Sequence, residues 1–245
     1  GTPGDAAWTT QLTRDFLVNM SPGSWGSGSE RGMGSVLQLL ADNEPTATAF
    51  FRKGSLRVVT FVSDEEDQTM DIPASPPGGF GPFTDYTSTC APKTVDGYTY
   101  TISTCANPAK LTPVATVKTQ LDTFFKSLDA TAENPDPSPN YFVISIVATT
   151  GAGLQSLHAD RCAEETALFG SCSTSCDRAD RYIQLGNLVC NCSLAMNIAS
   201  SDYTPLLDSI GVTLVSKKSV FTLARAPLGS EDILMYVKHA DGTST

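Results

Sequence analysis

Residues 56–67 constrain the fold of this chain more than any other stretch. They read Leu-Arg-Val-Val-Thr-Phe-Val-Ser-Asp-Glu-Glu-Asp, and six of the first seven are apolar or β-branched. This composition predicts a central parallel strand that is buried on both faces. Four carboxylates follow it directly: Asp64, Glu65, Glu66 and Asp67. Because ligands of open α/β sheets bind beyond the carboxyl ends of the strands, this acidic loop is a candidate site; a solvated loop is the alternative.

The pattern of apolar residues elsewhere predicts an α/β fold. Residues 141–148 form a second apolar run typical of a buried strand, and residues 114–128 repeat apolar positions at helical spacing. Further helices are expected over 36–41, 177–188 and 202–215, the last with Asp202 as its N-cap and Gly211 at its end. Two late strands, 220–223 and 233–237, would form an antiparallel edge.

The alternation of strands and helices predicts a doubly wound, mostly parallel sheet flanked by helices. Residues 1–245 read as a single domain with two loop insertions, 68–113 and 150–176. The chain has no apolar run near the roughly 18 residues that a membrane-spanning helix needs. Its net charge of −10 argues against nucleic acid or an anionic membrane as partner and suits a cation or a basic protein.

Seven cysteines point to a secreted chain: Cys90, Cys105, Cys162, Cys172, Cys176, Cys190 and Cys192. Five of them lie in a stretch, 162–192, that reads as a loop rich in Ser, Asn and Asp. Zinc is the alternative, but the spacing within this stretch does not fit a zinc site and favours disulfides. We expect Cys90 to pair with Cys105, most of the other five to be oxidised, and one thiol to remain over. Disulfides indicate an oxidising compartment, so a secreted, periplasmic or cell-surface location follows.

Common catalytic motifs are absent from the sequence. The Gly/Ser-rich stretch 21–34 precedes a predicted helix but lacks the Gly-Lys-Ser/Thr of a P-loop, and no Gly-x-Ser-x-Gly occurs. His158 and His239 accompany no nucleophile pattern, so both are interpreted as surface or packing residues.

The order of these pieces resembles the von Willebrand factor A-like (VWA) domains of secreted and surface proteins of Gram-negative bacteria. The resemblance is carried by the Gly/Ser loop before a helix, by Phe50 to Asp67, by Arg181-Tyr182-Ile183 and by residues 202–211. It covers about residues 14–240 apart from the two insertions. It implies a VWA or Rossmann-like sheet and a metal-ion-dependent adhesion site made by three loops.

The resemblance assigns site residues one by one. Asp64 matches the third loop, and residues 26–30 match the second, where Ser27, Ser29 or Glu30 stands in place of the usual Thr. The Asp-x-Ser-x-Ser of the first loop does not occur in this sequence. Mg²⁺ or Ca²⁺ is therefore allowed but not required, with Asp64, Ser27, Ser29 and Glu30 as ligands. A protein partner would contact Trp25, Glu65, Glu66 and Asp67.

Three functions compete at this point. The first is a binding or adhesion module whose sheet-top site engages a protein partner. The second is a structural surface-assembly subunit with a degenerate ion site. The third is a Mg²⁺-dependent phosphoesterase using Asp64, Glu66 and Asp67, for which Arg31 or Arg57 would have to approach the acidic loop, because phosphoryl transfer recruits cationic side chains.

One expected element has no counterpart in the sequence. No hydrophobic strand precedes residue 14, although a doubly wound sheet has its first strand in the middle. Backbone groups left unpaired inside a sheet cost about 1–3 kcal/mol each. We therefore expect the domain to lack its first strand and to receive it from an upstream fragment of the same polypeptide or from a neighbouring subunit by β-strand addition.

Overall fold

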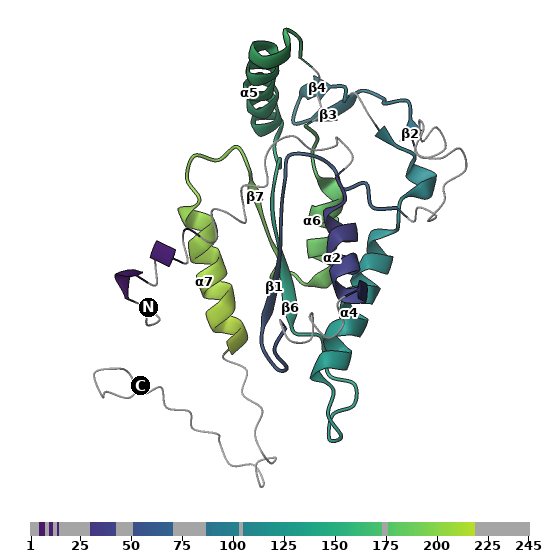
Figure 1. Cartoon of the computed structure of the whole chain (residues 1–245), viewed down its shortest axis with the longest axis vertical. Helices are drawn as coiled ribbons and strands as arrows, with labels where there is room; N and C mark the ends of the chain where they lie inside the picture. Colours follow the sequence, from purple (N-terminus) through teal and green to yellow (C-terminus); the bar gives the residue numbers. More distant parts are fainter. Residues whose placement is uncertain are drawn as a thin grey trace.

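The computed structural model describes residues 5–7, 10–11, 14, 30–42, 51–70, 87–102, 105–172 and 176–218. Within these ranges the chain forms an α/β structure, in which a three-stranded parallel sheet carries helices on both faces (Figure 1). The strands are β1 (Arg57–Ser63), β6 (Tyr141–Val147) and β7 (Leu194–Asn197) in the order β1-β6-β7. The prediction of a mostly parallel sheet flanked by helices is confirmed for the described residues.

Alternation along β6 separates two hydrophobic cores. Tyr141, Val143 and Val147 face a core shared with β1 and three helices: α2 (Gly32–Asp42), α4 (Val114–Asp129) and α6 (Asp180–Val189). The intervening Phe142 and Ile144 face the other side, where Leu206 of α7 (Thr204–Lys218) packs on them. Since successive side chains of a strand point to opposite faces, β6 anchors both layers.

The prediction that β1 is a central strand buried on both faces is wrong for the described part of the chain. β6 lies in the middle, and β1 pairs with β6 alone among the strands within the described ranges. Val59 and Phe61 are buried against the helices, whereas Val58 and Val62 on the opposite face keep exposures of 36% and 43%. The reason is that α7, the described helix on this side of the sheet, packs on β7 and β6 rather than over β1.

The described ends of the insertion at 68–113, where the chain leaves the sheet and returns to it, lie side by side. Met70 bridges Leu111 in antiparallel fashion, and the Thr112 N–H donates to the Thr69 carbonyl over 2.9 Å. Its described part, 68–70, 87–102 and 105–113, contains two small antiparallel pairs and a 3-10 turn: β2 (Thr87–Ser88) with β5 (Cys105–Ala106), β3 (Lys93–Val95) with β4 (Tyr98–Tyr100), and η1 (Pro108–Lys110).

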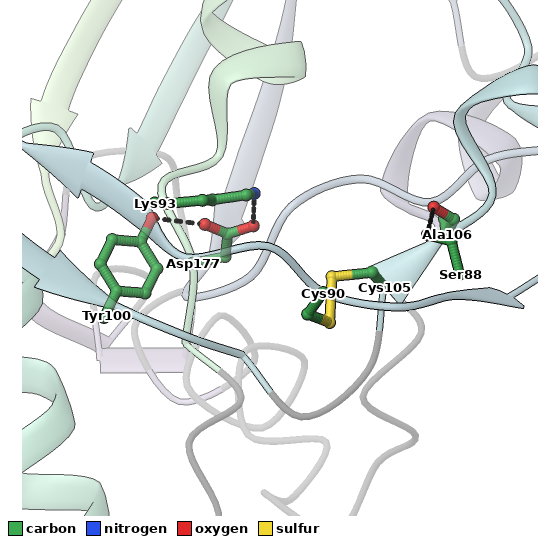
Figure 2. The surroundings of a disulfide bond; sticks show 7 residues. All are labelled: Ser88, Cys90, Lys93, Tyr100, Cys105, Ala106 and Asp177. Atoms are coloured by element: carbon green, nitrogen blue, oxygen red, sulfur yellow. Dashed lines mark hydrogen bonds and ion pairs between the residues drawn. A yellow bond between two sulfur atoms is a disulfide. The ribbon is translucent and has the colours of Figure 1, made fainter.

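The hairpin β3–β4 turns at Asp96-Gly97, where both residues have positive φ, 47° and 82°. This is the geometry that two-residue hairpins require, and Asp-Gly adopts it readily. The predicted Cys90–Cys105 disulfide is present and closes the segment that contains this hairpin (Figure 2).

The second insertion is not the loop that the sequence suggested. Residues 151–169 form α5, a 19-residue helix that extends beyond the carboxyl end of the sheet beside β4 (Figure 1). Thr150 caps its start by accepting the Gly153 N–H, and Gly170 ends it at φ 73°. The helix was missed because few of its side chains are buried, so its sequence lacks a clear apolar stripe.

Other predicted elements fare better. The helices expected at 36–41, 114–128, 177–188 and 202–215 correspond to α2, α4, α6 and α7. The Asp202 carboxylate accepts the Thr204 N–H at the start of α7 over 2.8 Å. Gly211 does not end this helix, which continues to Lys218. The expected strands at 220–223 and 233–237 lie outside the described residues, as do Trp25, Ser27, Ser29 and His239.

The cysteines pair as expected in number. Cys162–Cys172 and Cys190–Cys192 join the pair already described, and Cys176 is a buried free thiol. No helix in the described ranges has the length and apolar character needed to cross a membrane.

Candidate functional site

The acidic loop begins where β1 ends, at the carboxyl edge of the sheet. Ser63, the last residue of β1, donates its hydroxyl to the Glu30 carboxylate over 2.9 Å. The Gln68 N–H donates to the Glu30 carbonyl over 2.7 Å, so both ends of this loop contact Glu30. Glu30 and the acidic loop are therefore neighbours, while residues 26–29 of the Gly/Ser stretch lie outside the described residues.

Asp67 is the buried centre of this loop, with a side chain that is 0% exposed. Its carboxylate accepts the Met33 N–H at the start of α2 over 3.0 Å, and both the N–H and the hydroxyl of Thr69. Arg181 of α6 approaches it to 3.4 Å and donates a second N–H to the Thr112 carbonyl. Asp67 thus ties the loop to two helices.

The side chain of Glu66 reaches from the acidic loop to the first residues of α6. Its carboxylate accepts the main-chain N–H groups of Asp180 and Arg181 over 3.0 and 2.9 Å, and that of Asp67 over 3.0 Å. Burial raises the pKa of Glu66 to about 7, and the negative charges of Asp177 and Asp180 add to the rise, while the Arg181 and Asp67 N–H groups oppose it. Glu66 therefore exchanges a proton near neutral pH.

Asp177 links α6 to the hairpin of the insertion (Figure 2). Its buried carboxylate accepts the Tyr100 hydroxyl over 2.6 Å and forms an ion pair with Lys93. Burial and the hydrogen bond to Asp177 raise the pKa of Tyr100, so its phenol stays protonated. The insertion is held over the sheet edge by these two contacts from neighbouring strands.

Asp64 faces a different group. Its carbonyl accepts the Asp177 N–H over 2.8 Å, and its carboxylate lies 3.6 Å from the Cys176 thiol. Burial first, and then the charge of Asp64 and the hydrogen bond to it, raise the pKa of Cys176 to about 12. His158 of α5 holds the same segment, since its Nε2 lies 2.8 Å from the Cys176 carbonyl and its Nδ1 lies 2.8 Å from the Tyr98 hydroxyl. Of the two interpretations of His158, as a surface or a packing residue, these contacts and its 7% exposure support packing.

A cavity of about 340 Å³ opens between the acidic loop, the start of α6 and the insertion. Apolar side chains of the insertion form much of its wall, and Glu66, Asp67, Lys93, Asp177 and Arg181 supply its charged groups. An apolar cavity with a few convergent polar groups, one of them with a shifted pKa, is the usual form of a binding site.

The structure brings together only part of what the sequence singled out. Glu30, Ser63 and residues 64–67 share the sheet edge. Glu65 is buried beside the Ser63 hydroxyl, to which its N–H donates. Arg57, one of the two arginines that a phosphoesterase would have needed near the acidic loop, lies elsewhere: it begins β1 at the opposite end of the strand and forms a two-point ion pair with Asp129 at 2.6 and 2.7 Å.

Sequence reasoning missed three charged residues of the cavity: Lys93, Asp177 and Arg181. Arg181 belongs to a segment that carried part of the VWA resemblance, which was the one available signal. Lys93 lies in an insertion with no recognisable motif.

The described residues contain no group of three or more His, Cys, Asp or Glu side chains placed to hold a metal ion. Glu30, Ser63 and Asp64 nevertheless supply carboxylate and hydroxyl oxygens of the kind that Mg²⁺ and Ca²⁺ take. Comparison of the chain with protein-family models, with curated proteins and with solved structures found no match.

Proposed function

We propose that this chain is a secreted or cell-surface binding module of the VWA-like type, which engages a protein partner at the carboxyl edge of its sheet. The observation that carries the proposal is the contact between Glu30 and Ser63. It joins the Gly/Ser segment to the acidic loop at the end of a parallel strand. Ligands of open α/β sheets bind at this edge.

Three further features support the proposal. The parallel order β1-β6-β7 with helices on both faces is compatible with part of a doubly wound sheet. The cavity beside the acidic loop gives a partner a concave surface. Three disulfides suit an oxidising, extracytoplasmic compartment.

A divalent cation is part of the proposal in an optional role. Asp64 and Glu30, with Ser27 and Ser29 from the adjoining stretch, would hold Mg²⁺ or Ca²⁺, and a carboxylate of the partner would complete the ligand set. Calorimetry and thermal unfolding with Mg²⁺, Mn²⁺ and Ca²⁺ test this role. The expected result is an increase in melting temperature that Asp64→Ala abolishes and that Asp136→Ala, an exposed control, leaves unchanged.

The partner itself is tested by site-specific crosslinking. A photoreactive residue at position 30 should capture the same protein from the extracellular fraction of the source cells as one at position 66. A matched residue at position 133, on an exposed turn, should not. The purified partner should then lose at least about tenfold in affinity with Asp64→Ala; an unchanged affinity would move the site away from the acidic loop.

A structural assembly subunit is the second candidate, and the free edge of β1 favours it. Within the described ranges no strand lies on that side of β1, and Val58 and Val62 are exposed beside it. Exposed strand edges accept strands from other polypeptides, here a neighbouring subunit or an upstream fragment. If this candidate is right, hydrogen exchange of the β1 amides should slow in the assembled protein while the acidic-loop variants assemble normally.

A further inference from the structure

The charges of the cavity beside the acidic loop do not balance. Asp67 is paired with Arg181 at 3.4 Å, and Asp177 is paired with Lys93. Glu66 differs from both: among the described residues its carboxylate receives main-chain N–H groups and forms no ion pair. Asp177, which lines the same cavity, and Asp180, whose N–H Glu66 accepts, are also negative.

The three main-chain N–H groups that Glu66 accepts carry no net charge, so they do not neutralise its carboxylate. Asp180 has its own cationic neighbour, Arg178, at 2.8 Å, and that pair lies on the exposed side of the helix start. Inside the cavity the carboxylates therefore exceed the cations by one when Glu66 is ionised. Burying an uncompensated charge is costly, so a cationic group placed in the cavity would be stabilised there.

The walls of the cavity indicate the rest of the guest. Ile102, Ala106, Pro108 and Leu111 come from the insertion and line the cavity together with the charged groups. A guest with an apolar stem and a charged end matches such a lining, because lysine and arginine side chains bury their methylene groups while the charge remains solvated or paired. The volume of about 340 Å³ is at the low end for ligand sites, which suits one long side chain.

We infer that this cavity receives a lysine or arginine side chain of the protein partner, with its stem along Ile102 and Leu111 and its cationic end at Glu66. This inference rests on the proposed function, since it names what the partner inserts beside the acidic loop. The net charge of −10 favours approach of a basic segment over long range.

Small probes test the inference on the full chain without a known partner. The probes are n-butylammonium, n-butylguanidinium, n-butyrate and n-butanol, titrated by NMR with the methyl groups of Ile102 and Leu111 and the carboxyl carbon of Glu66 observed. The two cationic probes should bind saturably and at least about tenfold more tightly than butyrate or butanol.

Two variants test whether the cationic probes bind in this cavity. Glu66→Gln should weaken the cationic probes about tenfold or more while leaving n-butanol unchanged, since a charge-assisted contact is lost. Ala106→Phe should exclude all four probes by filling the cavity. Glu133→Gln, on an exposed turn, serves as control. Wild-type titrations carry the test if either cavity variant fails to fold.

Other outcomes would overturn the inference. Tighter binding of butyrate would make the cavity an anion site at Lys93 and Arg181, and no saturable binding of any probe would mean that the cavity takes no side chain. Either result would leave the cation and crosslinking tests of the acidic loop untouched, so failure here is distinguishable from failure of the proposed function.

Discussion

Arg181 lies 3.4 Å from Asp67, a residue 114 positions earlier in the chain, and this contact joins the first turn of α6 to the loop after β1. Because the same carboxylate also accepts N–H groups from α2 and from its own loop, the sheet edge is organised around one buried charge. The site therefore depends on a residue that is itself 0% exposed.

Asp67→Asn should destabilise the fold strongly. Removing the charge leaves Arg181 without its buried partner and weakens three further hydrogen bonds, which costs about 3–5 kcal/mol for a buried pair. Urea unfolding measures the change. Asp136→Asn is the matched control, because Asp136 pairs with Lys126 but is 81% exposed, and it should cost less than about 1 kcal/mol. Equal costs for the two variants would contradict the central role of Asp67.

Two glycine-to-alanine substitutions should have opposite signs. A Cβ at Gly151 would lie 2.1 Å from the Val95 carbonyl oxygen, a main-chain atom that cannot move alone, so overpacking should cost roughly 1–3 kcal/mol. Gly211 lies inside α7 with nothing within 4 Å of its added Cβ. There alanine should stabilise by about 0.5–1 kcal/mol through helix propensity. Thermal unfolding measures both changes in stability. A neutral Gly151→Ala would show that the start of α5 does not pack against the hairpin β3–β4.

Glu66 should make stability depend on pH in a direction opposite to most carboxylates. Folding raises its pKa from 4.5 to about 7, so between these values the folded chain holds a proton that the unfolded chain has released. Its contribution to the free energy of unfolding is therefore greatest at and below pH 4.5 and decreases as pH rises to about 7. The melting temperature of Glu66→Gln, relative to wild type, should rise by a few degrees between pH 5 and pH 8.

The control for this pH dependence is Glu133→Gln, at an exposed turn, whose melting temperature should stay at a constant offset from wild type over the same range. Asp129 supplies the contrasting sign: its ion pair with Arg57 lowers its pKa, so its contribution is lost as pH falls. A flat difference for Glu66→Gln would show that Glu66 is ionised at pH 5 in the folded chain.

Cys176 should be inert in the folded chain. With its pKa raised to about 12 by burial and by Asp64, less than about one part in a thousand is thiolate at pH 8, and only the thiolate reacts. Iodoacetamide without reductant should label no cysteine in the native protein and Cys176 alone after unfolding, as mass spectrometry of peptides would show. Asp64→Asn should speed native labelling; rapid labelling of wild type would contradict the buried position.

The sequence predicted two of the three parallel strands, β1 and β6, and most helices because each carries its own signal, whereas the short strand β7 was not predicted. The apolar run of β6 and the stripe of α4 determine their structure locally. By contrast, α5 packs through few residues near its start, including Leu154 and His158, so its periodicity is weak. The exposure of Val58 and Val62 depends on where α7 packs, and the sequence of β1 does not encode the position of that helix.

The candidate site, too, could be predicted from the sequence only in part. The acidic loop was found because its carboxylates follow a strand directly in sequence. Its partners were not, because Lys93 reaches Asp177 across 84 positions and Arg181 reaches Asp67 across 114. Contacts of that separation follow from how the insertion folds back over the sheet edge, and no local spacing encodes them.

The bridge between Met70 and Leu111 has a consequence for how such a chain can diverge. Because the insertion departs from and rejoins the sheet edge at adjacent residues, its length and sequence can change without altering the register of β1 against β6. The disulfide at Cys90–Cys105 lets the insertion keep a shape of its own. A related chain that exchanged the insertion as a unit would have a differently lined cavity over the same acidic loop. It would acquire a new partner while the sheet and its helices stayed constant.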